Sequence, residues 1–177
     1  MTHRVKTILS AFSLTETSRS FFTVSAALAA QLKARMVILH VVEQLQETYE
    51  GIAAAIFGAK KWQDILHEYR QDIHQPVFES DPEKQMISAV FDELCRDSEK
   101  RISGFESVKR EFLIREGDIV EEIITQSRER QCELIIMGAS WGSLPGSFVG
   151  PNIKSVIRKA EMPVVIAPLS PEYYGKD

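Results

Sequence analysis

The chain has few cysteines and no long apolar run. Cys95 and Cys132 are its only cysteines, and they lie far apart without the spacing of metal ligands. We therefore expect two reduced, partly buried thiols and no metal site. No segment approaches the roughly 18 consecutive apolar residues of a membrane-spanning helix. The polar start, Met1–Arg4, leads into a strand rather than a signal-type run, so we expect a cytoplasmic protein that does not bind membranes.

The chain also lacks an excess of basic charge. It carries 21 lysines and arginines against 25 acidic residues, a net charge of −4. A basic face supplies most of the affinity for duplex nucleic acid, so this balance argues against nucleic acid as a partner. Its 177 residues suggest a single domain over residues 1–177, long enough to bury about two thirds of its surface without a disulfide or metal staple.

Short apolar runs alternate with helical patterns along most of the chain, which predicts an α/β fold with a parallel sheet and helices on both faces. The third run alternates apolar and charged residues, as an edge strand does. The predicted strands are Val5–Phe12, Met36–Val42, Val108–Arg115, Leu134–Met137 and Pro163–Ala167.

Two of the predicted helices carry capping signals. Ser13 and Glu16 have the spacing of a capping box, which predicts a helix over roughly Thr15–Ala34. Asp118 with Glu121 predicts a second helix that runs to about Arg130. A third helix follows Gly150, because apolar residues recur there at helical spacing: Ile153, Val156, Ile157 and Ala160.

The segment Gln44–Phe105 contains no convincing strand, which predicts a helical insertion over about 44–105 after the second strand. Asp81-Pro82 has the pattern of a helix start, and that helix runs to about Arg101. The apolar piece Gly51–Ala59 fits a small hairpin or a helix. It could pack on its own domain, on a dimer partner or on a membrane surface, and we favour packing within a dimer.

The stretch after the fourth strand combines a glycine-containing loop with a helix start. Gly138, Gly142, Gly146 and Gly150 lie between that strand and the helix that carries Ile153. Glycine lets the backbone approach a ligand closely, and free N–H groups at a helix start attract anions. This order predicts an anion pocket. The alternative is a flexible connection that only closes the sheet.

Five segments together resemble the universal stress protein family: KTILSAF, VILHVVE, EGDIVEEII, ELIIMGAS and GPNIKSVIRKAEMPVVIAP. The resemblance implies a five-stranded parallel sheet in the order 3-2-1-4-5, with a ligand crevice where strands 1 and 4 lie side by side. It also implies a homodimer formed by pairing the last strand with its copy, through Val164, Val165, Ile166 and Ala167.

The resemblance further implies a possible site for ATP or AMP, and the chain departs from the family's pattern there. Trp141 stands where the second loop glycine belongs, with Gly142 one place late, and Pro151 stands in place of a serine or threonine. Ser13 replaces an aspartate that binds adenine. These changes predict weak binding. The residues implied are Ser13, Val41, Gly138, Ala139, Gly142, Gly150, Pro151 and Asn152.

No arrangement of histidine with serine, cysteine or carboxylate indicates a catalytic residue. His40 lies within an apolar strand and fits a core histidine with one satisfied hydrogen bond. We therefore expect a non-catalytic stress-response module, a homodimer with a degenerate nucleotide crevice that acts through an unknown protein partner. The alternatives are an ATP- or AMP-binding switch that uses the Gly138–Gly150 loop, and a slow ATPase.

Overall fold

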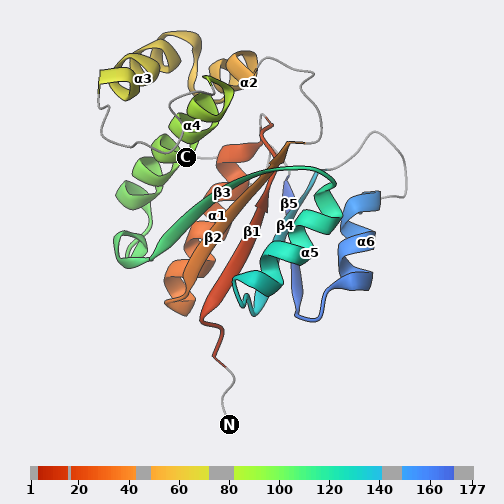
Figure 1. Cartoon of the computed structure of the whole chain (residues 1–177). Coiled ribbons are helices and arrows are strands. Elements are labelled where there is room, and N and C mark those ends of the chain that lie inside the picture. Colours follow the sequence, from red (N-terminus) through yellow and green to blue (C-terminus); the bar gives the residue numbers. More distant parts are fainter. Residues whose placement is uncertain (1–3, 16, 43–48, 72–81, 141–148, 170–177) are drawn as a thin grey trace.

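In the computed structural model, five parallel strands form one sheet in the order β3-β2-β1-β4-β5 (Figure 1). The structure describes residues 4–15, 17–42, 49–71, 82–140 and 149–169. The predicted fold class, strand order and adjacency of strands 1 and 4 are confirmed. The strands are β1 Thr7–Phe12, β2 Arg35–Val42, β3 Arg110–Glu116, β4 Leu134–Ser140 and β5 Val164–Leu169.

Helices cover both faces of the sheet, as the alternating pattern predicts (Figure 1). Helices α1 (Ser18–Leu32) and α4 (Pro82–Arg101) bury their apolar sides in one core cluster. Helices α5 (Ile119–Glu129) and α6 (Pro151–Lys159) do so in the other. The predicted insertion contains α2 (Tyr49–Phe57), α3 (Ala59–Gln71), α4 and a single 3₁₀ turn, η1 (Phe105–Ser107).

The strands read as apolar runs because both of their faces are buried. On β1, Ile8 belongs to the α1–α4 cluster and Leu9 to the α5–α6 cluster, and neither is exposed to solvent. Met36 and Val37 on β2 divide in the same way. Side chains alternate between the faces of a strand, so a central parallel strand needs an apolar residue at nearly every position.

Two predicted helix details have different outcomes. The cap at Asp118 is confirmed, because its carboxylate accepts a hydrogen bond from the Glu121 backbone N–H at 2.9 Å. The buried stripe of α6 is narrower than predicted. Ile153 and Val156 are buried, whereas Ile157 is 47% exposed. The helical spacing alone places Ile157 on the apolar side, but α6 lies near the β5 edge of the sheet, where there is less surface to cover it.

Aromatic rings fill the core between the sheet, α1 and α4. The Phe91 ring of α4 lies 4.6 Å from Phe12 and 4.1 Å from Phe112, measured between centroids. Phe22 of α1 meets Phe105 at 6.2 Å in an edge-to-face arrangement. Aromatic pairs of this kind add about 0.5–1.5 kcal/mol beyond their buried area. Helix α4 therefore serves as the crossover helix between β2 and β3, and α2 and α3 are the additional elements.

Helix α2 packs on its own chain, which is not the alternative favoured from the sequence. Ala53 and Phe57 are buried in the same cluster as α1 and α4, and Trp62 of α3 is fully buried. The Phe57 ring stacks on the Trp62 ring, with 6.2 Å between the ring centroids. The Arg19 guanidinium lies 5.5 Å from the centroid of the Phe57 ring. The apolar segment around Gly51 is therefore part of the monomer's core.

An ionic network joins α3 and α1 to α4. Lys61 Nζ lies 2.9 Å from the Glu93 carboxylate, and Arg19 lies 3.2 Å from Asp97. Arg96 also contacts Glu93, at 3.4 Å. The Glu93 side chain is only 8% exposed. A buried carboxylate is stable only with its cations in place, so this network ties the extra helices to the crossover helix.

The region between β2 and β3 contains helices and no strand wherever the structure describes it. The predicted cap at Asp81 lies outside the described residues. Between Tyr49 and Gln71 and along α4 the described chain is helical and contains no strand, as predicted. None of the described helices is both long and apolar enough to cross a lipid bilayer.

Replacing Trp62 with alanine should lower the free energy of unfolding by about 3–5 kcal/mol, because it empties a fully buried site between α2, α3 and α4. The exposed neighbour Lys60 gives a matched control, and Lys60→Ala should change stability by no more than about 0.5 kcal/mol. Urea unfolding followed by circular dichroism measures both. Equal, small effects would show that α3 is only loosely held.

Candidate functional site

The two central strands separate at their carboxyl ends. β1 and β4 pair from Ile8↔Leu134 to Ala11↔Met137. Beyond that point β4 continues beside β5 as far as Ser140↔Leu169, while β1 ends at Phe12 beside β2. Connections leave β1 and β4 in opposite directions, which makes this a topological switch point, where open α/β sheets bind ligands. The site predicted from the sequence lies around this β1–β4 opening.

The loop after β1 is shaped by Ser18 rather than by Ser13. Ser18 Oγ accepts a hydrogen bond from the Thr15 backbone N–H at 2.7 Å and donates to the Ser13 carbonyl at 3.1 Å. The predicted capping box is therefore wrong, and α1 begins at Ser18 instead of Thr15. Leu14 is buried in the core and fixes the loop there. Ser13 itself is exposed at the β1–β4 opening.

His40 lies beneath this loop. Its Nδ1 is 3.1 Å from the Phe12 carbonyl, so the ring donates to the last residue of β1. The side chain is 4% exposed. Burial lowers the pKa of His40, and the hydrogen bond to Phe12 opposes that shift only in part. The ring therefore stays neutral at physiological pH and joins β2 to β1, as expected of a core histidine.

Val41 follows His40 and is half-buried. On β2, Arg35 N–H donates towards β1 and Met36 N–H towards β3, so odd-numbered residues direct their backbone groups to the β1 side. The last partners on the two strands are Phe12 and His40. The Val41 carbonyl therefore points past the end of β1, where a ligand could use it.

Gly138 is a glycine for a packing reason. A Cβ atom at this position would lie 2.7 Å from Leu169 Cδ1 and 3.0 Å from Phe21 Cδ2. The side chains of β5 and α1 thus close directly over the β4 backbone. Ala139, on the other face, is 3% exposed and buried with α6. Packing explains why Gly138 and Ala139 are small residues, without a bound phosphate. No pattern in the sequence indicated that Leu169 and Phe21 would cover Gly138.

Helix α6 begins at the same end of the sheet, and its first turn offers few hydrogen-bond donors. Gly150 is its N-cap, in an extended conformation and without a side-chain hydrogen bond, and Pro151 is the first helical residue. The first turn of a helix has N–H groups without intrahelical partners. Proline supplies none, so the backbone N–H groups of Gly150, Asn152 and Ile153 are the ones without an intrahelical partner. Asn152 adds an exposed side-chain amide. Gly142 and the rest of the loop lie outside the described residues.

The described thiols are not poised for chemistry. Cys132 is buried and Cys95 half-buried, and burial raises the pKa of both to about 11. Both therefore remain protonated at neutral pH, and a protonated thiol is a poor nucleophile. Their reduced, partly buried state agrees with the prediction.

A profile described as "Universal stress protein family" matches residues 4–168. The chain belongs to the universal stress protein family. A search of curated protein sequences gives no significant match. Solved structures that resemble this chain share less than 25% of its sequence, so the likeness supports the fold and not the site.

The universal stress protein UspA from Lactobacillus plantarum is 17% identical; the match covers 93% of this chain and 98% of that one, with a TM-score of 0.61. A universal stress protein in complex with cAMP is 13% identical over 95% of this chain and all of that one, with a TM-score of 0.55. A family member from Burkholderia pseudomallei is 18% identical, over 95% and 99% of the two chains, with a TM-score of 0.51.

Gly138→Ala should destabilise this universal stress protein by about 1–3 kcal/mol, because the new methyl group meets Leu169 and Phe21. Gly150 provides the matched control, since a Cβ there has no heavy atom within 4 Å. Gly150→Ser should stabilise the protein by roughly a few tenths of a kcal/mol by capping α6. Chemical unfolding measures the two. A neutral Gly138→Ala would contradict the packing role.

Proposed function

We propose that this universal stress protein is a non-catalytic, homodimeric stress-response module that acts through a protein partner and binds an adenine mononucleotide weakly. The nucleotide would lie at the β1–β4 opening. A structural neighbour of the same fold is a complex with cAMP, which supports an adenine nucleotide as the ligand class. Family membership supports the role in stress response.

The start of α6 is the observation that carries the proposal. Its N-terminus carries the positive end of the helix dipole, which favours an anion, and its residues Asn152 and Ile153 offer backbone N–H groups. Pro151 removes one donor, and Gly150 has no hydroxyl to contribute. These few backbone donors and one side-chain amide suit a single phosphate better than a triphosphate, which needs more donors to stabilise its larger charge.

The other end of the opening suits adenine through the backbone. The Val41 carbonyl points past the end of β1 and can accept a hydrogen bond from the adenine amino group. Ser13 is exposed beside it and offers a hydroxyl. A neutral hydrogen bond contributes about 0.5–1.5 kcal/mol, less than one to a charged carboxylate. We therefore propose that the protein binds an adenine nucleotide more weakly than it would with an aspartate at position 13.

The groups around the opening support binding rather than catalysis. Among the described residues that flank it, Ser13, Thr15 and Asn152 offer hydroxyl and amide groups. His40 is the ionisable side chain there, and it is buried and held against the Phe12 carbonyl. A general base must reach the proton that it removes. His40 cannot do so without leaving the core.

The β5 edge supports the proposed homodimer. β5 is the last strand of the sheet, so one side of its backbone is left for a further strand. Val165 is 38% exposed on this strand, and Ile157 of α6 is the other large hydrophobic residue exposed in the described chain. Ala167, by contrast, is buried in the α1 cluster and would contribute only its backbone.

Pro151→Ser should strengthen AMP and cAMP binding by about tenfold. The variant gains an N–H and a hydroxyl at the phosphate, and a hydrogen bond to a charged group contributes about 1.5–3 kcal/mol. Pro163, exposed before β5, gives the matched control, so Pro163→Ser should leave the affinity unchanged. Isothermal titration with AMP, cAMP and ATP measures the effect, and a phosphate-release assay tests for turnover.

Unchanged affinity in Pro151→Ser would rule out missing phosphate donors as the cause of weak binding. Tight ATP binding by the unmodified protein would favour the nucleotide switch. Turnover of ATP that disappears in Asn152→Ala would contradict the non-catalytic proposal.

Val165→Asp should convert the homodimer into a monomer of 20.0 kDa, because it places a charge on the exposed face of the β5 edge. Thr125→Asp, at an exposed position of α5, is the matched control and should keep the dimer mass. Sedimentation equilibrium measures both. A monomeric unmodified protein, or a dimeric Val165→Asp variant, would contradict pairing through β5.

A further inference from the structure

The sheet ends in two edge strands that differ in character. In the order β3-β2-β1-β4-β5, the strands β3 and β5 each have a neighbouring strand on one side only. β5 has the sequence VVIAPL, without a charged residue, whereas β3 has the sequence REFLIRE, with two charged residues at each end. An open edge strand is a template for pairing with another chain, and charged side chains protect such edges. The two edges are therefore unequal as sites of self-association.

Alternate residues of β3 direct their backbone groups away from β2. Met36 N–H donates to the Lys109 carbonyl at 2.8 Å, and Gly117 N–H donates to the Val42 carbonyl at 3.1 Å. The odd-numbered residues from 109 to 117 therefore face β2, and in a parallel ladder the residues between them face the opposite way. The residues with outward backbone groups are Arg110, Phe112, Ile114 and Glu116.

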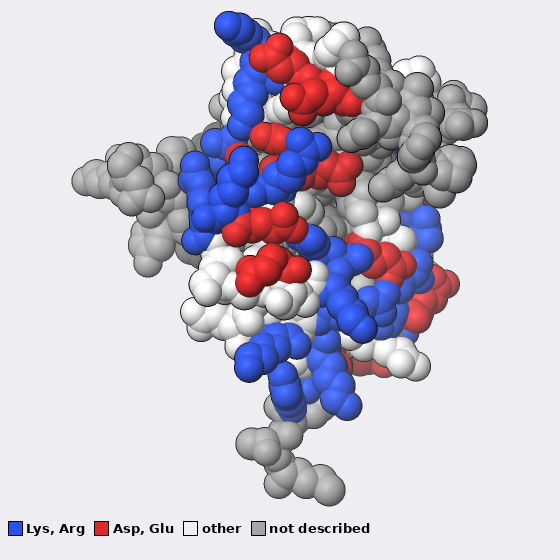
Figure 2. All heavy atoms as spheres, turned by 90° about the vertical axis from the view of Figure 1, so that its left-hand side faces the viewer, with Lys and Arg blue, Asp and Glu red and all other residues white. Residues whose placement is uncertain are grey.

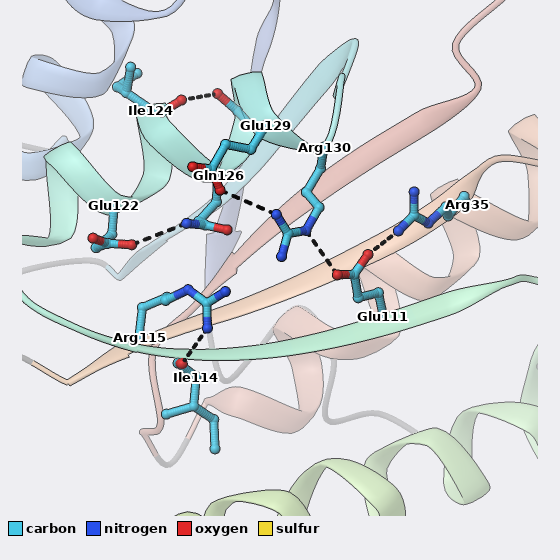
Figure 3. Close-up of polar contacts among 10 residues, drawn as sticks. Arg35, Glu111, Ile114, Arg115, Glu122, Ile124, Gln126, Glu129 and Arg130 are labelled. Carbon is cyan, nitrogen blue, oxygen red and sulfur yellow. Dashed lines mark hydrogen bonds and ion pairs between the residues drawn. The ribbon is translucent and has the colours of Figure 1, made fainter. Parts of the chain in front are cut away.

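The Arg115 side chain covers part of this outward edge. Its Nη1 donates a hydrogen bond to the Ile114 carbonyl, one of the outward groups, at 3.2 Å (Figure 3). None of the ion pairs between described residues includes Arg115, so this carbonyl is what holds the guanidinium in place. A hydrogen bond from a charged donor is stronger than one between neutral groups. A strand that pairs with β3 has to displace this guanidinium first.

Ion pairs hold the two ends of β3. Arg110, its first residue, lies 2.6 Å from Glu99, and Glu116, its last residue, lies 2.9 Å from Lys84. Lys84 and Glu99 belong to opposite ends of α4, so this helix is fastened to both ends of the edge strand. Figure 2, which faces the β3 side of the molecule, shows basic and acidic side chains interspersed over it. A pairing strand would meet these charges at both ends of β3.

We propose that Arg115 closes the β3 edge and thereby confines self-association to β5. The proposal rests on the proposed homodimer. Two copies that pair through β5 form one continuous sheet with a β3 strand at each outer end. If those outer edges were open, further pairing would join dimers into a growing chain, because a second, different contact on each copy does not close the assembly. The guanidinium over the outward carbonyl of Ile114 stops assembly at the dimer.

The test uses the Val165→Asp background, in which the β5 edge carries a charge and β3 is the edge left for pairing. Val165→Asp/Arg115→Thr should self-associate with a dissociation constant about tenfold or more below that of the control, Val165→Asp/Arg128→Thr. Threonine suits a strand and has no guanidinium. Arg128 is exposed on α5, so the control loses the same charge away from β3. Sedimentation equilibrium measures the mass, and circular dichroism confirms that each variant is folded.

Val165→Asp/Arg115→Gln gives a second neutral variant, which should self-associate in the same way. In the otherwise unmodified protein, Arg115→Thr should produce species larger than the dimer that grow with protein concentration. Monomeric double variants at position 115, or equal association in the Arg128→Thr control, would overturn the proposal.

The closure of β3 and the pairing through β5 can fail separately. A monomeric unmodified protein contradicts pairing through β5, and the comparison in the Val165→Asp background still decides whether Arg115 closes β3. A dimeric unmodified protein whose Arg115→Thr variant stays a dimer contradicts only the closure of β3.

Discussion

The pairing of β1 with β4 is the constraint on which the rest of the structure depends. It brings together segments more than 120 residues apart, from Ile8↔Leu134 to Ala11↔Met137. This pairing joins the two halves of the sheet. Both strands are covered on both faces, with one hydrophobic cluster on each face. The pairing also creates the switch point, since β1 continues to one side of the sheet and β4 to the other.

The same packing that builds the sheet limits the site. Leu169 and Phe21 close over Gly138, and Ser18 holds the loop after β1. The ligand groups that remain are backbone atoms of Val41 and α6 and a few neutral side chains. A crevice made largely of backbone groups tolerates substitutions such as Ser13 and Pro151 without loss of the fold. We propose that such a crevice binds a small phosphate ligand with modest affinity.

The two poles of the parallel sheet have different chemical characters. The carboxyl ends offer a helix N-terminus and neutral groups, and the amino ends carry the ion pairs of Glu111 with Arg35 and Arg130. The extra helices α2 and α3 lie on α1 and α4, held by Trp62, Phe57 and the buried Glu93.

Local periodicity and capping residues in the sequence determined the strands and the cap at Asp118, because both are properties of neighbouring residues. The family resemblance, and not periodicity, implied the strand order. The sequence also determined that His40 is buried. It did not determine where α1 begins, because the Ser18 hydroxyl bonds the Thr15 N–H and the Ser13 carbonyl and holds those residues in a loop. Contacts between distant segments decided the packing role of Gly138 and the direction of the Val41 carbonyl. Such features depend on strand register and on helix docking, and neither leaves a local pattern in the chain.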